Sequence, residues 1–153
     1  MRKVTMLLFL ILASATLFPQ DGAKKQPATL DGIALGMTKE QVKAVYPHPT
    51  SSDYDKNLWL YDSSSLSITF DESGLVSEVM SDDPSSAIVF EGLIIAYNSS
   101  MEKAAGYLGP PTKTFNTEMV SEYYFAEAGV VLLTYADDDA IALLALVKTY
   151  DKE

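Results

Sequence analysis

The sequence contains two stretches of similar order about 60 residues apart, and this internal repeat constrains the fold more than any other feature. Three pairs of segments carry the repeat: residues 30–34 and 90–94, residues 59–61 and 123–125, and residues 66–70 and 131–135. A repeat of this length, with the segments in the same order, indicates that the chain is built from two tandem structural units.

Each unit is predicted to begin with a short amphipathic helix. Thr38 followed by Gln41 is a capping-box pattern, and Pro47 ends the first helix. Ser99 with Glu102 repeats the capping pattern in the second unit. The first helix is expected to be about two to three turns long.

Three strand-like runs follow the first helix, at residues 57–62, 66–70 and 75–80. Apolar and polar residues alternate along them, and an acidic turn containing Gly74 separates the last two, which predicts an antiparallel meander. The expected fold class is therefore α+β, with two tandem repeats that each pack a short helical layer on an antiparallel β-meander.

The repeats are expected at residues 29–80 and 87–150, joined by a polar linker at residues 81–86. Each repeat alone is close to the size at which one core becomes marginal, so the two should share an interface.

The first 20 residues are typical of a secretory signal peptide. A basic start, an apolar run too short to span a bilayer comfortably and the small residues Ala13-Ser14-Ala15 favour cleavage over an uncleaved anchor. Residues 21–28 are expected to form a polar tether. No stable membrane insertion is expected after cleavage.

Cysteine is absent, and the formal net charge is −10, from 21 acidic and 11 basic residues. Without cysteine the chain has neither disulfides nor a lipid attachment site, so a soluble, non-lipidated protein of the periplasm or the exterior is expected. Nucleic acid is excluded as a partner because its phosphates require clustered Lys and Arg.

The first repeat resembles the SmpA/OmlA-type repeat, which occurs in the small lipoprotein of the outer-membrane barrel assembly machinery and, in tandem, in β-lactamase-inhibitory proteins. The resemblance rests on these residues: Gly32, Leu35, Gly36, Met37, Thr38, Val42, Pro49, Trp59, Tyr61, Phe70, Asp71, Gly74 and Val76. It implies helices packed on an antiparallel sheet, export, protein binding and no catalysis. The chain departs from the lipoprotein in lacking a lipidation cysteine, and from the tandem inhibitors in lacking disulfides.

Few residues are suited to catalysis or metal binding. The single histidine, His48, lies between two prolines, and no activated nucleophile pattern is present, so an enzyme is not expected. Asp137, Asp138 and Asp139 could offer oxygens to Ca²⁺, but their spacing lacks the alternating pattern of a calcium loop. A solvated turn is the preferred interpretation, and no metal or cofactor is predicted.

Aromatic residues are the main candidates for binding. Trp59 and Tyr61 share one face of their strand, Tyr123 lies on the corresponding face of the second unit, and Tyr124 lies opposite. Tyr and Trp are favoured anchors at interfaces. Ordinary core packing is the alternative interpretation.

The two sheets also differ in polarity. Val130 and Leu132 occupy places comparable to Ser67 and Thr69, and residues 140–147 form a continuous apolar run. The outer face of the second sheet is therefore expected to be a protein-contact or self-association surface.

These patterns predict an exported, non-enzymatic protein-binding module, either an envelope adaptor or an inhibitor-like protein. Its partner would be another envelope or secreted protein. The predicted contact residues are Trp59, Tyr61, Tyr123, Tyr124 and Leu132. The alternative is a carrier that binds a small molecule or an ion in the groove between helices and sheet.

Overall fold

The computed structural model describes residues 26–53 and 57–148. The elements of the first half are β1 (Thr29–Leu30), β2 (Ile33–Ala34), α1 (Lys39–Val45), β3 (Ser51–Asp53), β4 (Leu58–Tyr61), the 3₁₀ turn η1 (Asp62–Ser64), β5 (Leu66–Phe70) and β6 (Val76–Ser81). Those of the second half are β7 (Ala87–Phe90), β8 (Leu93–Ala96), α2 (Met101–Leu108), β9 (Lys113–Asn116), β10 (Val120–Phe125), β11 (Val130–Tyr135) and β12 (Ile141–Val147). The same order of strands and helix occurs in both halves.

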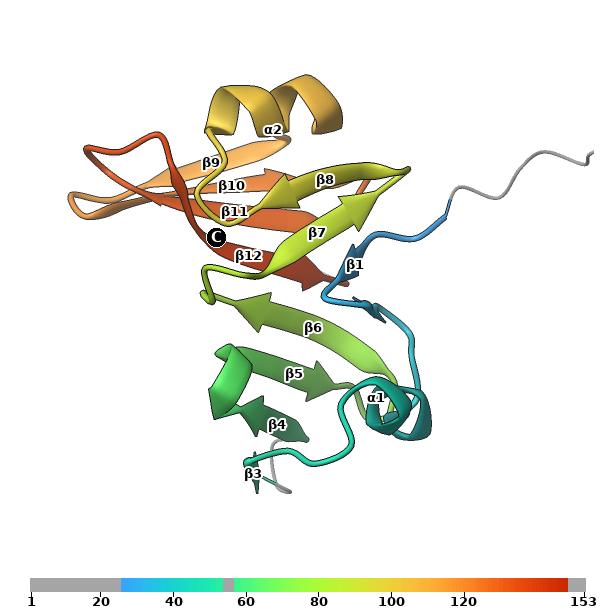
Figure 1. Cartoon of the computed structure of the whole chain (residues 1–153). Helices are drawn as coiled ribbons and strands as arrows, with labels where there is room; N and C mark the ends of the chain where they lie inside the picture. The colour runs from blue at the N-terminus through green and yellow to red at the C-terminus, as the bar shows by residue number, and fades with distance from the viewer. Residues whose placement is uncertain (1–25, 54–56, 149–153) are drawn as a thin grey trace, which may run out of the picture.

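The predicted α+β fold class is wrong, because the described chain is mostly β. Two sheets form its body, and the helices α1 and α2 have only seven and eight residues (Figure 1). The layer expected to be helical is largely a second sheet, made from a hairpin that precedes each helix.

The small sheet has the strand order β2-β1-β7-β8, so the hairpin of each half contributes two strands. Both hairpin turns have two residues with positive φ: 49° and 84° at Asp31 and Gly32, and 50° and 81° at Glu91 and Gly92. An acidic residue followed by glycine suits this turn, which joins antiparallel strands without splaying them. The prediction missed these hairpins because their strands are too short to show alternation.

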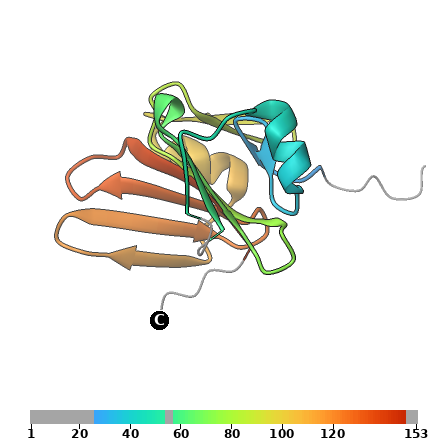
Figure 2. The ribbon, with the colours of Figure 1, turned by 90° about the horizontal axis from the view of Figure 1, so that it is seen from below.

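The large sheet has the strand order β3-β4-β5-β6-β12-β11-β10-β9, and all of its pairs are antiparallel. Each half supplies one four-stranded meander, and the last strands of the two meanders, β6 and β12, pair in the middle. Figure 2 shows the two meanders from below, with the small sheet and the helices on one side of the large sheet.

The two halves also repeat individual hydrogen bonds. The amide of Gly36 donates to the carbonyl of Val76 at 2.8 Å, and the amide of Asn98 donates to that of Ile141 at 2.9 Å. Both donors follow the hairpin and precede the helix N-cap, and both have positive φ. Each bond ties the helix entry to the last strand of its own meander.

Both helices are capped by a hydroxyl. Thr38 Oγ1 accepts from the Gln41 amide at 3.3 Å, and the Gln41 side chain accepts from the Thr38 amide at 2.8 Å, which completes the predicted capping box. The cap of α2 is Ser100, which accepts from the Lys103 amide, and not Ser99 as the sequence predicted. The Ser99 amide instead bonds the Ala96 carbonyl in the preceding turn.

The core lies between the two sheets and draws on both halves. Leu30, Ile88 and Ile95 enter it from the small sheet, and Ile68 and Leu144 enter it from the large sheet. Burying such a side chain contributes about 1.5–3 kcal/mol. One continuous core therefore joins the halves.

The predicted signal peptide, residues 1–20, lies outside the described residues, as do residues 21–25 of the predicted tether and residues 149–150 of the predicted second repeat. Ala28, at the end of the predicted tether, is buried in the core. Of the predicted linker, Ser81 is the last residue of β6, and residues 82–86 connect β6 to β7.

Candidate protein-binding surface

The large sheet has an inner face toward the small sheet and an outer face on the other side. Along β11, Val130 and Leu132 belong to the core between the sheets, while Val131 belongs to a separate apolar cluster. Successive side chains of a strand point to opposite faces. The separate cluster therefore lies on the outer face.

Three of the five predicted contact residues lie on the inner face of β4 and β10. Trp59 and Tyr61 are only 7% and 4% exposed, and Tyr123 is half-buried against the same core. The Trp59 ring packs edge-on against Phe70 with 4.7 Å between ring centroids. Packing is therefore the role that these contacts support, and the surface position expected for Trp59 and Tyr61 was wrong.

Leu132 is fully buried, so its expected place on the outer face was also wrong. The sequence comparison set Leu132 opposite Ser67, whereas in the structure Leu132 takes the inward position that Ile68 holds in β5. A strand slip of one residue exchanges the two faces of the sheet. The outward residues of β11 are instead Val131 and Leu133.

Tyr124 is the predicted contact residue that lies on the outer face. It is half-buried and packs against an apolar cluster drawn from four neighbouring strands. We call this cluster the outer-face patch; its members are Met80, Tyr124, Val131, Leu143, Ala145 and Val147. The patch members on β12 belong to the apolar run at residues 140–147 that the sequence analysis identified.

The corresponding outward positions of β5, in the first half, are the polar residues Ser67 and Thr69. Beyond the patch, Phe115 on β9 and Tyr135 at the end of β11 are 44% and 59% exposed. The outer face of the second meander thus combines the apolar patch with the charged residues Glu122 and Lys113 next to Tyr124, whereas Ser67 and Thr69 make the outer face of β5 polar.

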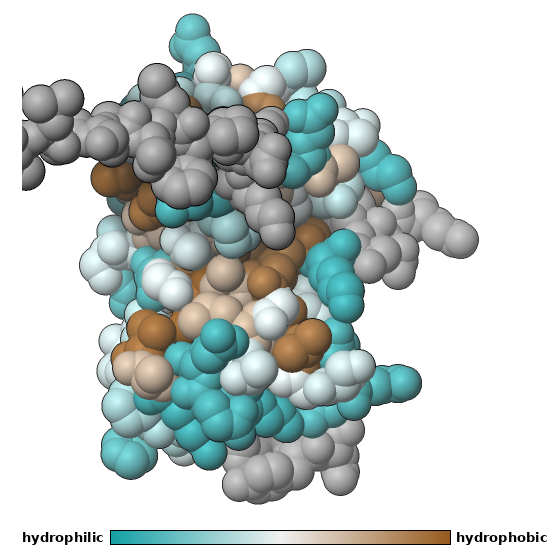
Figure 3. Space-filling model, turned by 90° about the vertical axis from the view of Figure 1, so that its right-hand side faces the viewer, coloured by the Kyte–Doolittle hydropathy of each residue, from teal (hydrophilic) through white to brown (hydrophobic). Residues whose placement is uncertain are grey.

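Two hollows adjoin the patch where β12 ends. The apolar hollow measures about 330 Å³ and is lined in part by Leu35, Phe90, Tyr124 and Val147. Figure 3 views the molecule from the side where β12 ends and shows apolar side chains gathered in the middle of that face, among hydrophilic ones. This hollow lies between strands and loops, and neither helix lines it.

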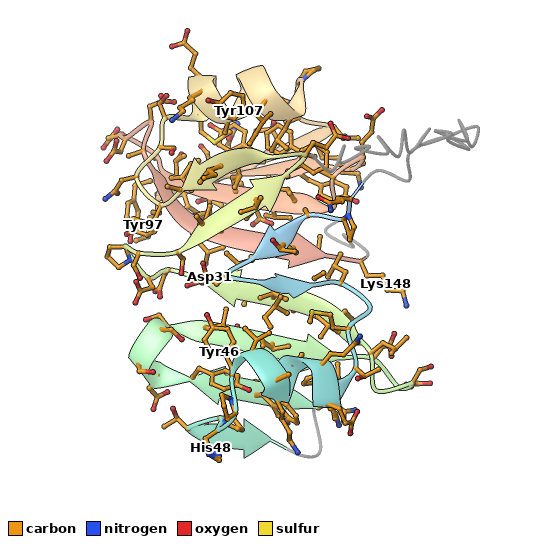
Figure 4. All side chains as sticks on the ribbon, turned by 45° about the vertical axis from the view of Figure 1, so that its right-hand side comes forward. Asp31, Tyr46, His48, Tyr97, Tyr107 and Lys148 are labelled. Carbon is orange, nitrogen blue, oxygen red and sulfur yellow. The ribbon has the colours of Figure 1, made fainter. Side chains whose placement is uncertain are left out.

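The acidic hollow measures about 380 Å³ and is lined by Asp71, Ser77, Glu78, Val147 and Lys148. The Lys148 ammonium pairs with Asp71 Oδ2 at 3.0 Å and, with backbone amides, holds the pKa of the Asp71 carboxyl below its usual range. Lys148 projects from the end of β12 in Figure 4. Val147 and Lys148 line both hollows, so the hollows adjoin.

A polar network lies away from this surface. Tyr61 donates to the Tyr46 carbonyl at 3.2 Å, and the two rings lie 5.3 Å apart. Burial, followed by the charges of Asp31 and Asp83, raises the pKa of the Tyr46 hydroxyl. The hydrogen bond between Tyr61 and Tyr46 ties β4 to the residue that follows α1.

The other residues weighed for chemistry lie in exposed loops. His48 follows α1 and is exposed, at the lower end of the molecule in Figure 4. Asp138 Oδ1 accepts from the Ala140 amide at 2.9 Å within the β11–β12 turn. Over residues 26–53 and 57–148, no three His, Asp or Glu side chains are grouped so that they could hold a metal ion.

Comparisons with known proteins give one distant structural match. The sequence matches no family model and no curated protein. The solved structure of a DUF4309 family protein (YjgB) from Bacillus subtilis subsp. subtilis str. 168 is similar at a TM-score of 0.45 and 15% identity, covering 73% of this chain and 78% of that one. Among the described residues, no helix is long and apolar enough to cross a membrane.

Proposed function

We propose that the protein is an exported, non-enzymatic binding module that holds another envelope or secreted protein against its outer-face patch. The observation that carries this proposal is the difference between the two meanders. The outer face of β10–β12 carries the apolar patch beside one acidic residue, Glu122, whereas Ser67 and Thr69 occupy the outward positions of β5. Val131, Ala145 and Val147 are nearly buried within the patch, so the area it offers to a partner comes from the half-buried Met80, Tyr124 and Leu143. An apolar patch on one side of a sheet is typical of a protein-contact site.

Tyr124 and Tyr135 support this proposal. Tyrosine buries much area, loses little rotamer freedom and offers a hydroxyl to the partner, so it is favoured at interfaces. The net charge of −10 favours a partner with a basic surface, because opposite charge accelerates encounter.

Site-specific photo-crosslinking in the native host tests the proposal. A photoreactive phenylalanine at Leu133 or Tyr135, on the outer face of β11, should capture a discrete partner. The same probe at Ser67, on the outer face of β5, is the matched control. Equal capture at all three positions, or none at any, would contradict the proposal.

Analytical ultracentrifugation of the purified protein separates a partner from a second copy. Self-association that is lost in Leu133→Glu but retained in Thr69→Glu would assign the patch to a homodimer and not to a different protein. Export is tested separately, by locating the mature N-terminus near residue 21.

The carrier alternative is tested by thermal shift with Ca²⁺ and a panel of small apolar ligands. A ligand-dependent rise in Tm without any crosslinked protein would favour the carrier. No change in Tm together with a crosslink at Leu133 would favour the binding module.

A further inference from the structure

We propose that the two adjoining hollows at the end of β12 form one groove for an extended basic segment of the partner. An apolar side chain of that segment enters the apolar hollow, and a Lys or Arg side chain reaches the acidic hollow. This inference rests on the proposed function and specifies the chemistry of the partner.

The apolar hollow has the size and lining of a side-chain pocket. Its volume of about 330 Å³ lies at the lower end of the range for ligand sites. Leu35 comes from the loop before α1, Phe90 from the tip of β7 and Leu146 from β12, so three separate segments form its walls. An aromatic or branched side chain placed there would bury its apolar surface away from water, and no strand or helix would have to move.

The acidic hollow lies beside the apolar one, and more acidic than basic side chains line it. Glu78 pairs in register with Val147 across β6 and β12, so its carboxylate lies on the outer face. Among the described residues, the hydrogen-bond partner of this carboxylate is the Thr69 hydroxyl at 3.5 Å, and no basic side chain pairs with it. Lys148 is engaged with Asp71. Glu78 therefore retains a negative charge for an incoming cation.

The rim of the apolar hollow adds to this imbalance. Of the described residues that line the two hollows, Asp71, Glu78 and Glu127 bear carboxylates and Lys148 alone bears a positive charge. A basic segment is favoured over an acidic one, because like charges placed together at an interface are repulsive.

Val147 gives the groove its continuity. It lines both hollows and also belongs to the outer-face patch. Alternate residues of an extended segment point to the same side, so an apolar and a basic side chain two positions apart can enter neighbouring hollows. A partner on the patch can thus place such a segment across the end of β12.

The test uses three peptides and ¹⁵N NMR titration of the full mature chain. The probe is acetyl-Gly-Phe-Gly-Lys-Gly-amide; the comparison peptides replace its Phe by Ala or its Lys by Glu. The probe should shift the amides of Glu78, Gly129, Val147 and Lys148, and each replacement should weaken binding by about tenfold, equal to about 1.4 kcal/mol. Equal binding of all three peptides, or shifts elsewhere on the molecule, would overturn the proposal.

Two variants test the two hollows separately. Ala126→Trp should fill the apolar hollow from its exposed edge and abolish Phe-dependent binding, with Ala44→Trp on the exposed side of α1 as its control. Glu78→Gln should remove the preference for Lys over Glu, with Glu40→Gln as its control. If the Lys preference persists in Glu78→Gln, the acidic hollow is not the cation site.

The outcomes also separate this inference from the proposed function. Crosslinking at Leu133 without peptide binding would reject the groove and keep the outer-face patch. Peptide binding without any crosslink would keep the groove and reject the patch as the contact surface.

Discussion

The Oδ2 atom of Asp31 lies 2.6 Å from the Oγ atom of Ser86, and this hydrogen bond joins the turn of the first hairpin to the start of β7. Asp31 Oδ1 also accepts from the Ala87 amide at 2.9 Å. The bonded residues are more than 50 positions apart, so one carboxylate fixes how the two halves meet in the small sheet.

Replacing Asp31 by alanine should destabilise the protein by about 2–4 kcal/mol. The Ala87 amide loses its acceptor at a cost of about 1–3 kcal/mol, and alanine is disfavoured at the positive φ of this turn. The Ser86 hydroxyl also loses Asp31 but keeps Ser81 Oγ at 2.7 Å. Urea unfolding measures the change. Asp31→Asn keeps an acceptor and tolerates positive φ, so it should lose clearly less; equal losses would show that these bonds do not matter.

The ion pair between Asp71 and Lys148 should make stability depend on pH. The folded pKa of Asp71 is lowered, so its contribution is present above the unfolded value of about 4 and is lost as pH falls through the folded pKa. Lys148→Gln should therefore be slightly less stable than the wild type at pH 7, and the gap should close on acidification. Denaturant unfolding of both proteins measures this difference in stability. The measurements run over about pH 2–7, so that they include the pH near 4 at which an aspartate titrates.

Lys103→Gln is the control for this prediction, because the described contact of Lys103 is with the Tyr107 ring and involves no carboxylate. A gap for Lys148→Gln that stays constant with pH would show that Asp71 is not the partner that matters. Added salt at pH 7 should narrow the gap, since exposed pairs are screened.

Neighbouring leucines in β11 should respond differently to truncation. Leu132→Ala should cost about 2–5 kcal/mol because it leaves a cavity in the core between the sheets, whereas Leu133→Ala, on the outer face, should cost less than about 1 kcal/mol. Thermal and chemical unfolding of both variants test the assignment of the two faces. A larger loss for Leu133→Ala would reverse that assignment.

Two glycines should show opposite effects of substitution by alanine. Gly129 has a φ of 63°, and an added Cβ would lie 3.0 Å from the Val147 carbonyl oxygen, so Gly129→Ala should lose more than about 1 kcal/mol. Gly106 lies within α2 with open space around it, so Gly106→Ala should gain about 0.5–1 kcal/mol. Differences in Tm of the same sign would contradict this reasoning.

Local signals in the sequence located several elements correctly. Thr38 and Gln41 marked the start of α1 because a capping box satisfies helix amides through residues next to each other in the chain. The strands expected at residues 57–62, 66–70 and 75–80 correspond to β4, β5 and β6, whose ends differ by one residue at most. Alternation with period two is a local property, so it survives without knowledge of the fold.

The second layer and the binding surface depend on distant pairing, so the sequence located them poorly. The pairing of β1 with β7 places Leu30 opposite Ile88. A strand of two residues is too short for its sequence pattern to predict this pairing. Leu132 was assigned to the wrong face of the sheet because the two halves were aligned one residue out of register. Tyr124 was singled out, but its neighbours in the outer-face patch come from three other strands, which meet only after folding.

The place of β12 sets how the protein can come apart. This strand follows all the others in the described chain, yet it lies in the middle of the large sheet, between β6 and β11. In a chain cut or stalled before Ile141, the large sheet would be divided into two parts, β3–β6 and β9–β11. The strand edges of β6 and β11 that face β12 would then be unpaired. Such intermediates are prone to wrong pairing between molecules, so the pairing of β12 with both meanders also protects the protein against aggregation.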